Sequence, residues 1–431
     1  MPTPRPRLPR HLPLSPALLG LVLALVGCAF FSRGQGAEAA PGPAPLPAPA
    51  PAPSLATAPL LAPTLSQNVA SALGEKLENL GRLYESDSNA FLQELWILGR
   101  FHGQYHWSEG SAGEDEGYET RRFRLGSQAR LFNKLTLHAQ MVSGSDIEPF
   151  YNGFTELWAQ WAFAPQVALT IGQQKHRFTH DRNVSSRYIN YLERSMLTNM
   201  VGADYTPAVT LQGKIGPVTY YTGLFSNATS REIDDSFTQF DSGHSLLAAA
   251  YISLGRPFGL DSAHLHITGL HSQANENATN LDRFDNAAST ALILTQGSAA
   301  LVTELTAGLG GEGGDAYGLN LQPSYFLTDN LQLALRYQIA ASSSPLGLEP
   351  QSRYEAPAGL PNGDLYQAGY IGLNYHIAKH RLKIMTGIEY ATLGGESVWT
   401  ASTMVRFFFG PHSGGPFPMN QMLDGHFMEH D

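Results

Sequence analysis

The sequence predicts an all-β protein, a sixteen-stranded antiparallel transmembrane β-barrel with a short N-terminal periplasmic helix. Three observations support this fold class. Apolar and polar residues alternate along many short segments, which is typical of strands whose two faces meet different surroundings. The connections between these segments alternate between long and short, as they do in bacterial outer-membrane barrels. Charged residues make up only 15% of the 431 residues, against roughly 25% in soluble proteins.

Composition also excludes several classes of protein. A formal net charge of −10 argues against a nucleic-acid-binding protein. The single cysteine, Cys28, excludes an intrachain disulfide framework and a cysteine-rich zinc site. The 43 glycines and the 10% of aromatic residues, without a long apolar run beyond the N-terminal region, suit a barrel better than a helical membrane protein. We expect no cofactor.

Residues 1–39 are predicted to be a signal peptide. Three arginines precede an apolar run at 17–31 that is too short for a comfortable membrane span, and Ala37-Glu38-Ala39 then offers a small-residue cleavage site. A second interpretation starts from Leu25-Val26-Gly27-Cys28, which resembles a bacterial lipobox and would leave Cys28 acylated. The sequence leaves both endings of the signal open.

Two further segments precede the barrel. Residues 40–63 are almost entirely alanine, proline and leucine, a composition that favours extended polyproline conformations and predicts a spacer. Residues 64–90 are predicted to contain a short amphipathic helix, because apolar residues recur every three or four positions from Val69 to Tyr84. This helix would form a short periplasmic coiled coil or plug, or would pack on the barrel rim.

The barrel is predicted to span residues 95–409. We expect strands near 95–107, 119–131, 134–143, 154–163, 167–174, 207–215, 217–226, 244–256, 261–272, 289–296, 299–308, 316–326, 331–341, 365–377, 380–391 and 397–409. Seven short turns and eight long loops, the first at 108–118, connect them, so both ends of the barrel are periplasmic. An even strand number allows closure, and a lumen of this size holds water rather than packed side chains.

The tail at 410–431 is predicted to be flexible. It carries His412, His426 and His430, but their Gly-rich spacing does not preorganise ligands, so we expect no metal site.

Alternation assigns the charged residues of the strands to the lumen. In the first strand Arg100 and His102 face inward; in the second Arg122 and Arg124 do so, while Arg121 falls on the opposite face. A charge on the lipid face at mid-membrane costs about 2–4 kcal/mol, whereas a charge in a wet lumen costs little. The predicted anion path consists of the inward cations Arg100, Arg122, Arg124, Arg130, Arg336, Lys383 and Arg406.

The predicted lumen is therefore basic although the whole chain is acidic. The strands carry the inward carboxylates Glu156, Glu304 and Glu389, and most other acids lie in external loops. Local sign rather than net charge sets which ions a pore favours, so we hypothesise a path for anions. The alternative is that the arginines pair with the lumenal glutamates and the loop acids.

The connection at 175–200 is too long and too apolar for a free loop. Its Tyr188, Tyr191, Leu192, Met196 and Leu197 need a surface to bury against. Either it folds into the barrel and narrows the lumen, or it forms an external lid. In the first case the constriction carries the cations Lys175, Arg177, Arg182, Arg187 and Arg194.

Several motifs occur in an order and spacing typical of one family. They are Arg121-Arg122-Phe123-Arg124-Leu125-Gly126, Ile171-Gly172-Gln173-Gln174-Lys175 followed by Phe178, Ser185-Ser186, Tyr191-Leu192-Glu193-Arg194-Ser195 and Gly223-Leu224-Phe225-Ser226-Asn227. Over residues 95–409 the chain thereby resembles the phosphate-selective porin O and P family. The resemblance implies a channel in the bacterial outer membrane, usually a homotrimer, surrounded by outer-membrane lipid. It also implies that the third external loop constricts the pore and that the solutes are small anions such as phosphate.

The chain departs from the phosphate-specific members of that family in one respect. It has only six lysines, and the lysine cluster that those members carry in the lumen is not visible. A nonspecific or sugar-type channel is the alternative, in which Trp96, Trp158, Tyr366 and Tyr370 stack solutes.

Two other classes of protein are also considered. A barrel enzyme is disfavoured because no Gly-x-Ser-x-Gly motif or fixed acid–base constellation stands out, so we expect no catalytic residues. A scaffold or adhesion barrel with passive loops is the third interpretation.

Overall fold

The computed structural model describes residues 73–74, 76–202, 204–229 and 232–411. The chain divides into two units, residues 1–64 and 65–431, and the described residues all belong to the second unit. The predicted signal peptide with Cys28, the spacer at 40–63 and the tail from 412 onward lie outside the described residues, so these assignments stay predictions.

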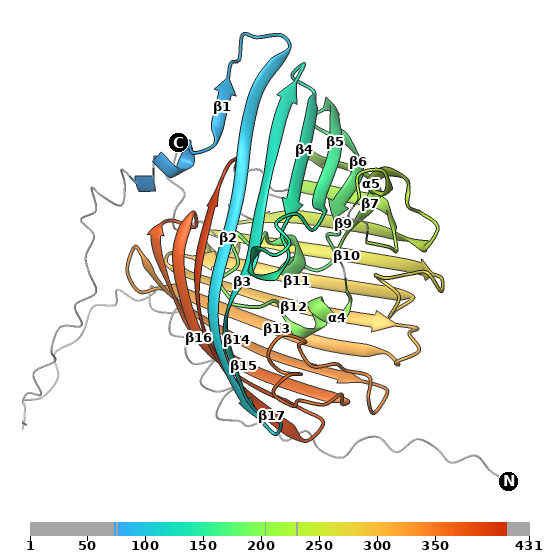
Figure 1. Ribbon diagram of the computed structural model, residues 1–431, viewed down its shortest axis with the longest axis vertical. Coiled ribbons are helices and arrows are strands. Elements are labelled where there is room, and N and C mark those ends of the chain that lie inside the picture. Colours follow the sequence, from blue (N-terminus) through green and yellow to red (C-terminus); the bar gives the residue numbers. More distant parts are fainter. Residues whose placement is uncertain (1–72, 75, 203, 230–231, 412–431) are drawn as a thin grey trace, which may run out of the picture. The chain divides into compact units, whose positions relative to one another are not determined.

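Sixteen strands of the described part form a closed antiparallel barrel (Figure 1). They are β2 (Leu92–Gly110), β3 (Gly113–Leu131), β4 (Leu135–Val142), β5 (Phe154–Ala164), β6 (Val167–Lys175), β7 (Tyr205–Ile215), β8 (Val218–Ser226), β9 (Gly243–Gly255), β10 (Ser262–Ala274), β11 (Asn286–Gln296), β12 (Ala299–Leu309), β13 (Ala316–Phe326), β14 (Leu331–Ser342), β15 (Leu365–Ala378), β16 (Leu382–Leu393) and β17 (Glu396–Phe409). Each strand pairs with its neighbours in sequence, and β17 pairs with β2, which closes the ring. Every predicted strand is present, and the predicted barrel is confirmed.

The predicted alternation of short turns with longer loops holds for six of the eight predicted loops, whereas the connections at 111–112 and 394–395 have only two residues. The turns at one end are 132–134, 165–166, 216–217, 256–261 with η2 (Pro257–Gly259), 297–298, 327–330 and 379–381. The loops at the other end are 143–153 with η1 (Ser145–Ile147), 176–204 with α3 (His180–Asn183) and α4 (Met196–Met200), 227–242 with α5 (Asp235–Thr238), 275–285, 310–315 and 343–364. None of the helices in the described ranges is long and apolar enough to cross a membrane.

The prediction of an external loop at 108–118 is wrong. The strands β2 and β3 continue through this segment and meet in a hairpin whose loop is residues 111–112. Cross-strand contacts hold the extension together: Tyr105 donates a hydrogen bond of 2.7 Å to Glu116, and His106 Nε2 lies 3.2 Å from the Asp115 carboxylate. Asp115 and Glu116, which were expected in a loop, are therefore held by contacts across the β2–β3 ladder.

A further strand, β1 (Arg82–Glu85), lies beside the seam of the barrel. β17 ends with Phe409 opposite Gly99 of β2, and β1 pairs with the next residues of β2, with Arg82 opposite Trp96. The helix predicted within 64–90 is seen only at residues 73–74 and 76–78, and a strand stands where its end was expected. The physical reason is that the edge of β2 beyond β17 presents backbone groups that another strand satisfies.

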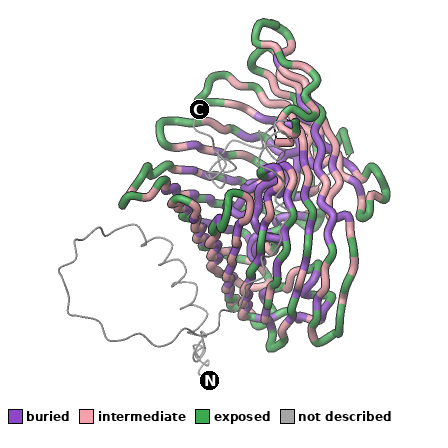
Figure 2. The backbone as a smooth tube through the Cα atoms, turned by 90° about the vertical axis from the view of Figure 1, so that its left-hand side faces the viewer, coloured by how far each residue is buried: buried purple, intermediate pink, exposed green. Residues whose placement is uncertain are grey.

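Inward and outward faces of the strands follow the predicted alternation. On β2, Arg100 and His102 are buried inside the barrel, whereas Ile97 and Tyr105 are exposed on its outer face. Buried and more exposed positions alternate in the same way along the other strands (Figure 2).

Arg121 is the exception to this alternation. His102 pairs with Arg122, but the next residue of β2, Gly103, pairs with Thr120, so Arg121 is an extra residue in β3. Such a β-bulge re-aims side chains. The side chain of Arg121 is only 7% exposed and lies inside the barrel, rather than on the outer face that alternation predicts.

Candidate functional site

The longest loop, residues 176–204, folds into the barrel and is called the constriction loop below. Between His176 and Thr198 every residue is buried except Arg182 and Ser185, which are half-buried. Of the two interpretations that the sequence left open, the inward fold is therefore the one observed.

Apolar residues of the constriction loop bury against two parts of the inner wall. Phe178, Val184, Tyr188, Met196 and Leu197 join a buried cluster with inward residues of β8–β12, including Leu247, Ala291, Ile293 and Val302. Tyr191 and Leu192 pack with Ala334, Tyr370, Met385 and Met404 of β14–β17. Small or apolar residues at inward positions of these strands make room for the loop, and they are the sequence signal for the inward fold.

Three cations of the predicted anion path hold the loop instead of lining an open lumen. Arg406 is fully buried, and its guanidinium donates to the carbonyl oxygens of Ser186, Ile189, Tyr191 and Leu192 at 3.0–3.4 Å. A loop folded into a barrel has carbonyl groups that need donors, and a guanidinium supplies several at once.

Lys383 and Arg336 act in the same way at two other points of the loop. Lys383 Nζ donates to the Ile189 carbonyl at 2.9 Å. Arg336 donates to the Glu193 carbonyl at 2.6 Å and forms an ion pair of 2.7 Å with Glu389. Arg336, Lys383 and Arg406 therefore anchor the constriction loop, and their part in a solute path stays a prediction.

Acidic and basic groups brace the loop from inside as well. Glu304 of β12 accepts the backbone N–H groups of His180 and Asp181. Arg194 donates to the Val184 carbonyl at 2.8 Å, and burial lowers its pKa to about 10. Arg182 pairs with Asp204 at 3.0 Å. Burial lowers the pKa values of His176 and His180 to about 3.

A second loop, residues 343–364, meets the constriction loop at Glu193. Arg353 Nε lies 3.9 Å from the Glu193 carboxylate, and the Tyr354 hydroxyl lies 3.4 Å from it. Burial, with the Glu389 carboxylate nearby, raises the pKa of the next residue, Glu355, to about 7. The two loops therefore share one network of charged and polar groups.

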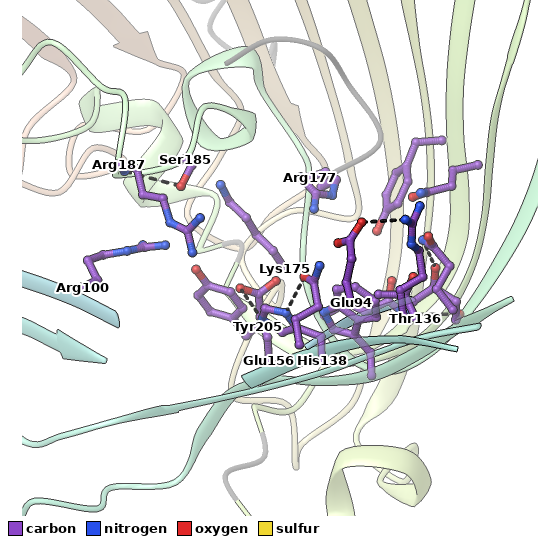
Figure 3. Close-up of a pocket in the computed structure, with 18 residues that line it drawn as sticks. Glu94, Arg100, Thr136, His138, Glu156, Lys175, Arg177, Ser185, Arg187 and Tyr205 are labelled. Carbon is purple, nitrogen blue, oxygen red and sulfur yellow. Dashed lines mark hydrogen bonds and ion pairs between the residues drawn. The ribbon is translucent and has the colours of Figure 1, made fainter. Parts of the chain in front are cut away.

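A cavity of about 350 Å³ lies between the constriction loop and the inner wall formed by β2–β8 (Figure 3). Its cationic lining residues are Arg100, Arg130, Lys175, Arg177 and Arg187, and its acidic ones are Glu94 and Glu156. Aromatic and neutral polar residues complete the lining, among them Trp158, Tyr205, Tyr221, Gln128 and Gln160.

Two of the seven predicted path cations line this cavity. Arg100 donates to Ser186 Oγ of the constriction loop at 2.6 Å. Arg130 pairs with Glu94 at 2.7 Å, and its side chain remains 41% exposed. Arg124 donates to the Tyr205 hydroxyl at 2.9 Å. Arg122 points inward beside Arg121, and neither Arg122 nor Arg124 contributes to the lining.

Three of the five predicted loop cations line the cavity. Lys175 Nζ donates to the Asn183 and Val184 carbonyls at 3.2 and 3.4 Å. The Arg177 guanidinium lies 5.6 Å from the ring centre of Tyr221. Arg187 donates to the Pro411 carbonyl at 3.0 Å.

Some residues that line the cavity were not among the predicted site residues. Tyr205 and Tyr221 lie on strands that flank the constriction loop, and Glu94 lies just before the first predicted strand. Only Tyr221 fell within a predicted strand, and the sequence did not show which part of the inner wall the constriction loop leaves uncovered. Among the described residues, no group of three or more His, Cys, Asp or Glu side chains is arranged to hold a metal ion.

The closed sixteen-stranded barrel has the fold of bacterial outer-membrane porins. Residues 95–245 match the family described as phosphate-selective porin O and P, which confirms the resemblance seen in the sequence. No curated protein matches the chain.

Solved structures of porins share this fold at low sequence identity. OprB of Pseudomonas putida is 13% identical, with a TM-score of 0.55, and the match covers 73% of this chain and 94% of OprB. An anion-selective porin from Comamonas acidovorans is 14% identical, with a TM-score of 0.51 and 73% and 99% coverage. OmpT of Vibrio cholerae is 14% identical, with a TM-score of 0.51 and 76% and 100% coverage.

Proposed function

We propose that this protein is a diffusion channel that favours small anions, including phosphate, and that the cavity between the constriction loop and β2–β8 is the path. The observation that carries the proposal is the charge of the lining, with five cations against two carboxylates. The sign of the charge lining a narrow pore sets which ions it favours. The Comamonas acidovorans porin, which has the same fold, is described as anion-selective.

The position of the constriction loop supports this path. The loop packs against β8–β12 and β14–β17, where its apolar residues are buried. We infer that ions pass on the side of β2–β8, where the cations that line the cavity lie. Arg130, with its exposed side chain, and Arg177 are the two cations that we expect to contribute most.

A planar-bilayer measurement tests the proposal. The full-length purified protein is inserted into a membrane under a KCl gradient, and the reversal potential is recorded for the wild type and for the double variant Arg130→Gln/Arg177→Gln. We expect a reversal potential on the chloride side, which moves towards zero in the double variant. Arg256→Gln is the matched control, because Arg256 is exposed in the turn between β9 and β10.

A reversal potential on the potassium side would overturn the anion proposal. A nonspecific or sugar-type channel would then be the better description, because Trp158 and several amide side chains also line the cavity. Block of the chloride current by added phosphate would support a phosphate site, and its absence would limit the function to general anion diffusion.

The assembly and the N-terminal processing are also proposals. We infer a homotrimer from the family resemblance alone, and the mass of the native complex in detergent tests it. Intact mass of the mature chain distinguishes cleavage after Ala39 from acylation of Cys28.

A further inference from the structure

The inner wall beside the constriction loop carries side chains in rows set by the strand register. Gln128, His138, Trp158 and Gly172 stand opposite one another on β3, β4, β5 and β6. One row further along, Thr136, Gln160 and Thr170 stand opposite one another on β4, β5 and β6. Because neighbours in a row share one face of the sheet, the cavity has an aromatic row beside a row of amide and hydroxyl groups.

The aromatic row presents a flat apolar surface. The His138 and Trp158 rings are stacked, with centroids 4.9 Å apart and planes 8° from parallel. On the other side of Trp158 the row continues with Gly172, which adds no side chain to it. Inorganic phosphate has no apolar face to pack on such a ring, whereas the C–H face of a sugar ring does.

The carboxylates of the cavity also favour a sugar over inorganic phosphate. Glu156 lies 4.0 Å from His138 Nε2, and Glu94 pairs with Arg130. An ionised carboxylate only accepts hydrogen bonds, and it repels a nearby phosphate. Hydroxyl groups are donors from which a carboxylate and the amide oxygen of Gln160 can accept, so these groups favour a solute that carries several hydroxyls.

The cationic groups on the loop side supply a place for a negative charge. Arg100 and Arg187 lie on one side of the cavity, Glu94 and Thr136 lie on the other, and His138 and Glu156 lie between them (Figure 3). Arg100 stands opposite Arg124 of β3, and Arg124 is four residues from Gln128, which belongs to the aromatic row. Four residues of a strand span about 13 Å at roughly 3.3 Å per residue. A solute longer than inorganic phosphate can reach both zones.

We propose that the cavity binds sugar phosphates in preference to inorganic phosphate, with the phosphate group towards Arg100 and Arg187 and the sugar ring against Trp158. This inference rests on the proposed anion channel and specifies its substrate class. Trp158 acts here as a specificity-determining residue, and Glu156 and Gln160 receive the sugar hydroxyls.

The test compares three probes on the full-length protein in a planar bilayer. The concentrations that halve the KCl current are measured for glucose 6-phosphate, inorganic phosphate and glucose. We expect glucose 6-phosphate to block at a concentration at least about tenfold lower than either other probe, equivalent to about 1.4 kcal/mol. Trp158→Ala should abolish this advantage while phosphate block persists.

Two variants separate the side-chain role from general damage to the barrel. Trp161→Ala removes a tryptophan three residues further along β5 that is 38% exposed on the outer face, and the advantage of glucose 6-phosphate should survive it. Glu156→Gln should strengthen block by inorganic phosphate and narrow the difference between the two phosphates.

The outcomes distinguish this inference from the proposed function. Equal block by glucose 6-phosphate and phosphate in a chloride-selective channel overturns the inference and leaves the anion channel standing. Equal block by glucose and glucose 6-phosphate also overturns the inference, because the phosphate group then contributes nothing. A potassium-side reversal potential in the same membranes would instead overturn the proposed function.

Discussion

One Nη atom of Arg121 lies 2.5 Å from the Glu193 carboxylate and so joins the bulge of β3 to the constriction loop. The two side chains are only 7% and 10% exposed. The bulge adds one residue to β3, and that residue is the one that reaches the loop. A local irregularity of the barrel wall thus contributes to fixing the loop that divides the lumen.

Breaking this pair should loosen the constriction loop. Arg121→Ala leaves the buried Glu193 carboxylate with less compensation, and removal of one partner of a buried pair costs about 3–5 kcal/mol. We expect a larger and noisier single-channel conductance. The control is Arg82→Ala, because the pair of Arg82 with Glu85 is 33% and 51% exposed and such pairs contribute about 0–1 kcal/mol. Quiet currents of wild-type size in Arg121→Ala would contradict the expectation.

Replacing Arg406 should have a similar effect through a different contact. Arg406→Ala removes the donor for four loop carbonyls, and each buried group left unpaired costs about 1–3 kcal/mol. Conductance should increase, and proteolysis within 186–192 should become faster. Arg406→Lys should rescue only part of this protection, because an ammonium has three donors in a compact group. Full protection from proteolysis in Arg406→Lys would show that a positive charge alone, rather than the number of donors, holds the loop.

The loop at 343–364 should loosen as the pH rises. The pKa of Glu355 is raised to about 7 from its ordinary 4.5, so its protonated form is favoured in the packed loop. The stabilisation of the loop by protonated Glu355 is fully present below about pH 4.5 and is lost as the pH rises through about 7. The groups that face Glu355 are Glu389, Arg336, the Tyr366 hydroxyl and the Gln351 backbone N–H.

Protease cleavage within 343–364, measured from about pH 5 to about pH 8, checks this dependence. Cleavage should accelerate above pH 7 in the wild type, and Glu355→Gln should remove the acceleration, because its amide does not titrate. A wild-type profile flat across this range would count against the assignment to Glu355.

The constriction loop should respond to pH in the opposite sense. Burial lowers the pKa values of His176 and His180 to about 3 from 6.5. Their contribution to stability is present above about pH 6.5 and is lost as the pH falls towards 3. Acid should therefore increase current fluctuations, and His176→Gln/His180→Gln should reduce this effect. His271→Gln, at an exposed position on β10, is the control and should leave the acid response unchanged.

The barrel could be predicted from the sequence because its signal is local. Alternation with a period of two marks each strand independently, so sixteen strands could be found without any knowledge of contacts between them. The bulge at Arg121 shows where this reasoning fails. One extra residue reverses the alternation, and nothing in the pattern of arginines marks which residue is extra.

The site could be predicted only in part because it depends on distant contacts. Arg406 and Ile189 are separated by 217 positions in sequence, yet the Arg406 guanidinium donates a hydrogen bond to the Ile189 carbonyl. Inward orientation was correct for Arg336, Lys383 and Arg406, but their solvent exposure depends on the path of a loop from another part of the chain. Arg100 and Arg130 line the cavity because the constriction loop packs on the other strands.

The seam between β17, β2 and β1 has a consequence for how the ends of the barrel are built. β17 stops at Phe409, and Gly410, with a positive φ of 105°, turns the chain inward to Pro411, whose carbonyl Arg187 binds. Beyond this point the Gly81 carbonyl accepts from the Ile97 N–H at 2.7 Å, and β1 occupies the next places along β2. A β17 lengthened by two residues and β1 could not both be accommodated. β1 and β17 therefore use consecutive parts of the same edge of β2, and the turn at Gly410 sets the boundary between them.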